Sequence, residues 1–376
     1  MLKNFSLLFS ITIVLIISAK TYSQTSSSNN TSTTSAGGIT APKFSNEFMN
    51  IGVGARALGM ANTQASIVQD VTAGYWNPAG LLDIKTKYDV ALMHSEYFGG
   101  IIQYDYVGFA TPIDSLSHLA VSVIRLGADD IPDTRFLYDA DGQLNYDNIR
   151  FFGVADYGFL VSYARHLPLI PGLKWGANFK IIHRIVGRFA NAWGFGLDAG
   201  VKLDLKSGWH FGVVARDITG TFNAWSHTTA LLAETFTQTG NQIPRNSIEV
   251  TIPRLIVSAA KEFTIRKRFG ALISFDLNAT FDGKRNVPIS GERIAIDPSV
   301  GLELNYLKKI FLRGGVHNIQ QIKNTTGGGT FTSFQPTFGV GIRVSRFNID
   351  YAFTDIANQA EALSSHVFSL KIAINK

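Results

Sequence analysis

The sequence predicts an all-β fold: a transmembrane antiparallel up-and-down β-barrel of about 14 strands, with an N-terminal plug or hatch inside the lumen. Three observations lead to this expectation. Long segments alternate between apolar and polar residues, the connections between them alternate between short and long, and no apolar run reaches the length of a membrane helix. A membrane helix needs about 20 apolar residues, whereas a tilted membrane strand needs roughly nine to eleven residues.

The alternation is clearest in 193–205, where odd positions are apolar and even positions are glycine, aspartate or lysine. The same period of two recurs in 173–181, 273–278, 338–345 and 368–375. Strands of soluble sandwiches average about five or six residues, and these segments are longer. We therefore expect the apolar face of each strand to meet lipid and the polar face to line the lumen.

About fourteen such segments follow one another along the chain. They lie near 88–95, 101–111, 116–126, 154–166, 172–186, 191–205, 208–216, 254–263, 268–280, 296–306, 309–317, 334–345, 347–354 and 366–374. The alternating connections are typical of membrane barrels with tight periplasmic turns and larger outside loops. An even strand count then puts both termini in the periplasm of a Gram-negative bacterium.

The chain begins with features of a secretory signal peptide over residues 1–23. Lys3 precedes an apolar run from Phe5 to Ser18, and Thr21 and Ser23 are small residues just before Gln24. Residues 24–41 are rich in Ser, Thr and Asn and predict a disordered spacer. The remaining chain divides into an expected hatch over 42–84 and an expected barrel over 85–376.

Residues 48–82 are unusually rich in glycine and alanine, which suits a backbone threaded through a narrow space. A barrel of about fourteen strands has a lumen wider than its wall side chains fill, and this segment is the available filler. We expect Pro78 to hold Asn77 extended and Gly80 to permit a chain reversal, so that the segment ends in a turn.

Two short motifs in this segment resemble a known family. The stretch GARALGM at 54–60, then Asp70 and the stretch YWNPAG at 75–80 resemble the N-terminal signature of the PorV/PorQ outer-membrane barrels. That family belongs to the superfamily of the FadL-type long-chain fatty-acid transporter, whose hatch carries a similar Asn-Pro-Ala. The resemblance implies a component or partner of the type IX secretion or gliding apparatus, which binds a large translocon barrel or secreted cargo.

The candidate hatch or gate residues come from the same motifs. They are Arg56, Gly59, Trp76, Asn77, Pro78, Ala79 and Gly80. Asn77-Pro78-Ala79 is either a gate whose displacement opens a path or a structural turn that joins the plug to the first strand. Arg56 is expected either to pair with an inward carboxylate such as Asp198 or Asp204 or to face the periplasm.

Two outer loops contain further candidates. A short helix is expected over 228–236, and the loop's apolar residues could contact a partner or ligand or simply pack on one another; they are Leu231, Leu232, Phe236, Ile243 and Pro244. A second loop places oxygen ligands at Asp139, Asp141, Asn145 and Asp147. This set is a weak calcium candidate, because the third acid and terminal Glu of the usual calcium loop are missing.

Several functions are disfavoured. The chain contains no cysteine, so thiolate catalysis and thiolate metal sites are excluded. It has no Gly-x-Ser-x-Gly, His-Glu-x-x-His or Walker motif, and we expect neither an enzyme nor a cofactor. The formal charge of +6 is mild and spread along the chain, which argues against nucleic-acid binding.

Three functions remain from the sequence. The first is the secretion or gliding role implied by the resemblance, and the second is a FadL-like passive channel for a hydrophobic ligand. The third is a structural barrel in contact with outer-membrane lipid. The inward strand positions are polar, which counts against an apolar conduit through the lumen. We further expect Trp193→Lys or Phe195→Lys to block membrane assembly and Lys202→Gln to be tolerated.

Overall fold

The computed structural model describes residues 45–139, 141–167, 170–243, 246–323, 329–354 and 365–375. The chain divides into two compact units, Met1–Ala41 and Pro42–Lys376, and all of the described residues belong to the second. The expected signal peptide and spacer lie outside the described residues. Among the described residues, no helix is long and apolar enough to cross a membrane.

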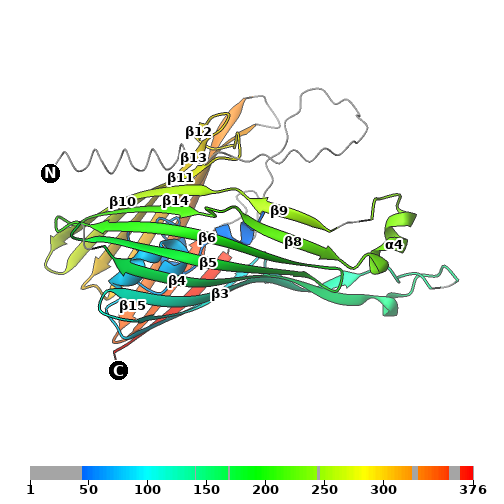
Figure 1. Cartoon of the computed structure of the whole chain (residues 1–376), viewed down its shortest axis with the longest axis horizontal. Coiled ribbons are helices and arrows are strands. Elements are labelled where there is room, and N and C mark those ends of the chain that lie inside the picture. Colours follow the sequence, from blue (N-terminus) through cyan, green and yellow to red (C-terminus); the bar gives the residue numbers. More distant parts are fainter. Residues whose placement is uncertain are drawn as a thin grey trace. The chain divides into compact units, whose positions relative to one another are not determined.

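The second unit is a closed antiparallel barrel (Figure 1). Its strands are β1 (Tyr88–Tyr97), β2 (Ile102–Pro112), β3 (Ser117–Asp133), β4 (Arg150–His166), β5 (Leu173–Val186), β6 (Ala190–Asp204), β7 (Trp209–Arg216), β8 (Thr221–His227), β9 (Ser247–Thr251), β10 (Arg254–Arg266), β11 (Phe269–Thr280), β12 (Ile289–Ser290), β13 (Ala295–Tyr306), β14 (Ile310–Lys323), β15 (Thr330–Val344), β16 (Phe347–Thr354) and β17 (Ser365–Ile374). Pairing of β1 with β17 closes the sheet, and Tyr88 lies opposite Ile374. Closure removes the open edges of the sheet, as lipid requires.

The barrel has fourteen strands, which confirms the predicted number. β7 and β8 both pair with β6 and form one interrupted strand, and β9 and β10 form the next. β12 is a two-residue addition to β13. Neighbouring strands follow the chain order, so the topology is up-and-down.

Several strands extend further towards the long loops than the sequence indicates. β3 continues to Asp133, β14 to Lys323, and β15 begins at Thr330. The expected loop 217–253 contains β8, β9 and the helix α4 (Thr229–Gln238). These extensions are less apolar than the rest of the wall, so the alternation that marks the other strands is weak there. Within the described parts of the loops, the other helix is η3 (Tyr146–Asn148).

The two faces of the wall are as predicted. Trp193 and Phe195 of β6 are 48% and 39% exposed, whereas Asp198 and Lys202 of the same strand are 4% and 3% exposed. The other strands show the same alternation of exposed apolar and buried polar side chains. The apolar side chains therefore form an outward band, and the charged side chains point inward.

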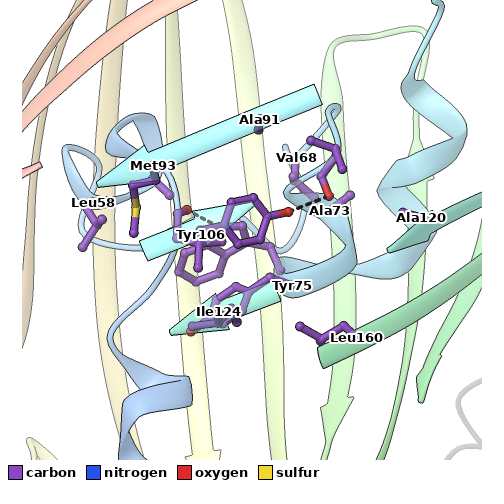
Figure 2. Packing of buried hydrophobic residues seen from close by; sticks show 14 of the residues in the cluster. Leu58, Val68, Ala73, Tyr75, Ala91, Met93, Tyr106, Ala120, Ile124 and Leu160 are labelled. Carbon is purple, nitrogen blue, oxygen red and sulfur yellow. Dashed lines mark hydrogen bonds between the residues drawn. The ribbon is translucent and has the colours of Figure 1, made fainter. Parts of the chain in front are cut away.

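The N-terminal segment, residues 45–87, contacts the inward side of this wall. It contains four short helices, η1 (Glu47–Asn50), α2 (Ala55–Leu58), α3 (Ala73–Trp76) and η2 (Pro78–Asp83). Most of its side chains are buried. Its apolar residues share one cluster with strands β1 to β4, as Figure 2 shows for Val68, Ala73, Tyr75, Ala91, Tyr106, Ile124 and Leu160.

Candidate functional site

Asn77 fixes the N-terminal segment on strand β6. Its side-chain amide donates to the carbonyls of Ala65 (2.7 Å) and Val201 (3.1 Å), and its oxygen accepts from the Ala79 N–H (3.1 Å). Asn77 is therefore the N-cap of η2, with Pro78 as the first helical residue. A Cβ on Gly200 would lie 2.2 Å from the Asn77 oxygen, so the close approach requires glycine there.

The motif after Asn77 is a helix start and not the expected closing turn. Gly80 lies inside η2, and its φ is outside the left-handed region. Glycine is needed there because a Cβ would lie 2.7 Å from the Val68 carbonyl oxygen. Pro78 and Ala79 lie against Gly176 of β5, where a Cβ would approach the Ala79 nitrogen to 2.7 Å. Residues 77–79 thus pack closely against the glycines of β5 and β6.

The hatch candidates Trp76 and Gly59 also make close contacts, Trp76 within the N-terminal segment and Gly59 with the wall. Trp76 donates from Nε1 to the Val53 carbonyl (2.9 Å) and meets Tyr75 edge-on at 4.8 Å between ring centroids. Arg216 of β7 lies 4.6 Å from the Tyr75 ring. Gly59 approaches β15 closely, since a Cβ there would lie 2.9 Å from the Gly339 Cα.

Arg56 pairs with the wall, although not with the partners expected. Its guanidinium binds both oxygens of Glu303 on β13, at 2.9 and 3.2 Å, and neither Asp198 nor Asp204. Glu303 also accepts from Arg313 (2.7 Å), which in turn binds Asp350 (2.7 Å). Burial lowers the pKa of Arg56, but the carboxylates of Glu303, Asp70 and Asp350 together raise it by more, so the guanidinium stays charged.

We expect Glu303→Gln to destabilise the protein by about 3–5 kcal/mol, because it leaves two buried arginines without their shared carboxylate. Arg56→Gln should cost clearly less, since Glu303 keeps its pair with Arg313. The free energy of unfolding in urea, measured in lipid vesicles, tests both. Equal effects of the two changes would contradict the shared-carboxylate arrangement.

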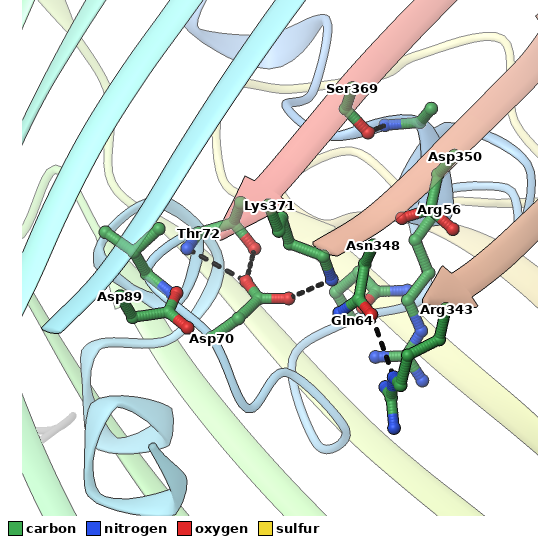
Figure 3. Close-up of polar contacts among 12 residues, drawn as sticks. Arg56, Gln64, Asp70, Thr72, Asp89, Arg343, Asn348, Asp350, Ser369 and Lys371 are labelled. Atoms are coloured by element: carbon green, nitrogen blue, oxygen red, sulfur yellow. Dashed lines mark hydrogen bonds and ion pairs between the residues drawn. The ribbon is translucent and has the colours of Figure 1, made fainter. Parts of the chain in front are cut away.

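Asp70 forms the second ion pair between the N-terminal segment and the wall. It is one of the residues that resemble the PorV/PorQ signature. Figure 3 shows it between Thr72 and Lys371 of β17, and the Lys371 ammonium lies 2.6 Å from its Oδ2. Burial raises the pKa of Asp70, but the Lys371 ammonium, the Thr72 hydroxyl and Arg56 together lower it by more, to about 2. The stabilisation is present in full above the ordinary pKa of 3.8 and is lost as the pH falls through about 2.

Lys202 forms a third ion pair between the wall and the N-terminal segment. On this geometry we expect Lys202→Gln to be destabilising, contrary to the expectation from the sequence. Its ammonium donates to the Val68 carbonyl (3.0 Å) and to Asp83 (2.6 Å), both in the N-terminal segment. Lys174 of β5 binds the same Asp83 carboxylate. The substitution would therefore remove a buried charge that holds the segment to the wall.

The wall itself is interrupted next to this segment. We call residues 217–220, between β7 and β8, and residues 252–253, between β9 and β10, the wall break. Pairing stops after Arg216 opposite Arg254 and resumes at Thr221 opposite Thr251. The break faces the middle of β6, where Asp217 N–H donates to Asp198 (2.8 Å) and Ile218 N–H to the Leu197 carbonyl (2.9 Å).

The wall break contains a strained residue that buried charges hold in place. The backbone N–H groups of Asp217, Ile218 and Gly220 are bonded within the break. Asp217 adopts a left-handed backbone conformation, with φ of 55°, which carries local strain. Lys180 of β5 binds both Asp198 and Asp217, which holds the interrupted strand against its neighbour. This combination of strain and buried charge makes the wall break a candidate functional site.

The turn Ser45–Asn50 covers the inner side of the wall break. Asn46 donates to the Thr251 hydroxyl (2.8 Å) and accepts from Asn223 (2.8 Å). On the outer side, Ile218 and Ile252 are 46% and 37% exposed, towards lipid. Polar contacts of a few side chains thus separate the wall break from the interior.

A polar cavity of about 590 Å³ lies at the short-turn end of the barrel. Charged side chains from the N-terminal segment and the wall line it, among them Arg56, Asp70, Asp83, Lys202, Glu303, Arg313 and Lys371. It is unsuited to an apolar ligand.

The outer-loop candidates are placed as follows. Leu231, Leu232 and Phe236 are half-buried on α4, which is tied to the β3–β4 loop because Arg135 donates to the Leu231 carbonyl. Ile243 is 39% exposed. Pro244 lies outside the described residues.

The calcium candidates use their oxygens within their own loop. Asp139 Oδ1 accepts from the N–H groups of Asp141 (3.1 Å) and Gln143 (2.9 Å), and Asn145 Oδ1 accepts from Asp147 N–H (3.1 Å). No group of three His, Asp or Glu side chains within the described ranges could hold a metal ion.

Comparison with solved structures identifies the fold. The chain is similar to the toluene transporter TbuX of Ralstonia pickettii, at 12% identity and a TM-score of 0.50, over 86% of this chain and 98% of that one. It is also similar to the toluene transporter TodX of Pseudomonas putida, at 11% identity and a TM-score of 0.53, over 86% and 99%. A Pseudomonas aeruginosa FadL homologue matches at 11% identity and a TM-score of 0.50, over 86% and 98%.

The chain has the FadL-type barrel fold. No protein-family profile matches the sequence, and no curated protein matches it significantly. This outer-membrane fold and the outward apolar band fit a Gram-negative outer membrane.

Proposed function

We propose that this FadL-type barrel is a passive, non-enzymatic outer-membrane channel for hydrophobic small molecules. The wall break carries this proposal. It lies opposite the middle of β6, where the outward side is apolar, and the Ser45–Asn50 turn covers it from inside. A hydrophobic molecule that left through the break would enter lipid directly, without crossing the charged cavity. The polar lining at the short-turn end therefore does not oppose this function.

Apolar side chains fill the interior around the N-terminal segment. Phe48 and Met49 of that segment are buried in one cluster with Tyr97 of β1 and Tyr104 of β2, and Phe98 packs against this cluster. The substrate class is taken from the solved relatives, since TbuX and TodX are toluene transporters and CymD, another barrel of this fold, is a monoaromatic hydrocarbon channel. We extend that class to this chain as part of the proposal.

A reversible disulfide tests this route, because the chain has no cysteine of its own. In Asn46→Cys/Thr251→Cys, oxidation should fix the Ser45–Asn50 turn to the wall break. We expect oxidation to lower the uptake of labelled toluene into proteoliposomes at least about tenfold, which corresponds to a shift of about 1.4 kcal/mol or more towards the closed state. Uptake should return when a reductant is added. Each single cysteine variant, treated with the same oxidant, is the control. Unchanged uptake with the disulfide verified by mass spectrometry would contradict the route.

A specific observation keeps the type IX secretion role as a second candidate. Exposed apolar and aromatic side chains gather on the long-loop side, including Tyr138 (64%), Tyr146 (70%), Phe151 (65%) and Ile248 (69%). Such a surface suits docking of a translocon subunit or cargo protein. Purification in native detergent distinguishes the two, because a large secretion barrel in the eluate would favour this role over hydrocarbon transport.

A further inference from the structure

Three short turns on one side of the barrel carry a set of exposed cations, which we call the basic arc. It consists of Arg266, Lys267, Arg268, Lys308, Lys309 and Arg346, all exposed. The turns join β10 to β11, β13 to β14 and β15 to β16, which are successive short turns around the barrel. Backbone bonds connect neighbouring turns, from Leu307 N–H to the Arg268 carbonyl and from Arg343 N–H to the Lys309 carbonyl, both 2.7 Å. The arc is therefore continuous.

The positive charge of the arc is largely uncompensated. Within the described ranges, the carboxylate seen at ion-pair distance from the arc is that of Glu262, whose Oε1 lies 4.0 Å from the Lys308 ammonium. The Lys308 side chain is nevertheless 75% exposed. The turn between β2 and β3, elsewhere on the same rim, instead exposes Ile113 and Leu116. Lys206, in the turn between β6 and β7, and Lys85 and Lys87, just before β1, are further exposed cations of this rim. The charge is therefore densest at the arc but is not confined to it.

The arc lies at the border of the lipid-facing band. Exposed apolar side chains flank its three turns, namely Ile265, Phe269, Leu307, Ile310 and Val344. The Arg346 guanidinium also lies 5.2 Å from the centre of the Phe347 ring. Aromatic and cationic side chains at this position mark the level of the lipid headgroups in membrane proteins.

We propose that the basic arc binds the phosphate-bearing headgroups of anionic phospholipids in the leaflet that it faces. Cations at the headgroup level are attracted to an anionic membrane surface, and the attraction is summed over the residues involved. Lys308 and Arg346 also line the mouth of the polar cavity, whereas Arg266, Lys267, Arg268 and Lys309 do not. Cations spread over three turns in this way suit a layer of headgroups better than one soluble phosphate. The flanking apolar side chains favour lipid over an acidic protein at the same level.

Lipid retention by the purified full-length barrel tests the proposal. The barrel is exchanged into mixed micelles with equal amounts of phosphatidylglycerol and phosphatidylcholine, and native mass spectrometry counts the retained lipids. The test variant is Lys267→Gln/Lys308→Gln/Lys309→Gln. The control, Arg188→Gln/Lys284→Gln/Arg293→Gln, removes the same charge from exposed positions at the long-loop end. The retained ratio of phosphatidylglycerol to phosphatidylcholine should fall at least about fivefold in the test variant and change less than about twofold in the control.

Three results would overturn the proposal. The first is an equal lipid ratio in the wild type and in the arc variant. The second is displacement of phosphatidylglycerol by millimolar inorganic phosphate without a change in ionic strength, which would indicate a site for soluble anions. The third is retention of an acidic protein that depends on the arc while lipid retention does not. Hydrocarbon uptake is measured separately, so failure of lipid retention leaves the channel proposal intact.

Discussion

Gly200→Val should release the N-terminal segment from the wall and make the barrel permeable to larger solutes. A Cβ at this position lies 2.2 Å from Asn77 Oδ1, and Asn77 cannot swing aside without losing its bonds to Ala65, Val201 and Ala79. Overpacking of this kind costs about 1–3 kcal/mol, which would shift the balance towards a displaced segment about 5- to 150-fold. Liposome swelling with sugars of increasing size measures the change.

Gly314→Val is the matched control for this experiment. Gly314 is also a strand glycine, but the nearest atom to its Cβ would be the Thr337 carbonyl oxygen at 3.7 Å, an ordinary contact. The permeability of the Gly314→Val barrel should equal that of the wild type. A folded Gly200→Val barrel with wild-type permeability would show that Asn77 does not hold the segment in place.

Phe195→Lys should abolish assembly into the membrane. Phe195 lies near the middle of β6, points outward with 39% exposure, and stacks on Phe179 with 6.1 Å between ring centroids. A lysine at mid-depth on the lipid face costs about 2–4 kcal/mol. The fraction of folded barrel, read from the heat-dependent shift in electrophoretic mobility, should fall sharply.

Phe195→Leu keeps the apolar contact and should assemble normally. Lys284→Gln replaces Lys202→Gln as the charge-removal control, because Lys284 is exposed whereas Lys202 is buried in an ion pair. Normal assembly of Phe195→Lys would mean that the two faces of the wall have been assigned in reverse.

The candidate site could be predicted only in part from the sequence. The glycines and alanines of 48–82 indicate a segment that must approach other backbone closely, and Gly59 and Gly80 do so. The sequence could not provide Glu303 as the partner of Arg56, because the two are 247 positions apart and several inward carboxylates are equivalent in the alternating pattern. The wall break was also missed, although Gly220 and Pro253 are residues that interrupt strands.

The alternation of apolar and polar residues by itself determined the barrel, its number of strands and its two faces. This is possible because each strand side chain points either to lipid or to the interior, and the two environments demand different chemistry. Only the tertiary structure decided which inward charges pair, where the N-terminal segment rests and where the wall is interrupted. Those features depend on distances between residues from many strands, and a pattern that repeats every two residues carries no information about which strand lies opposite which part of the segment.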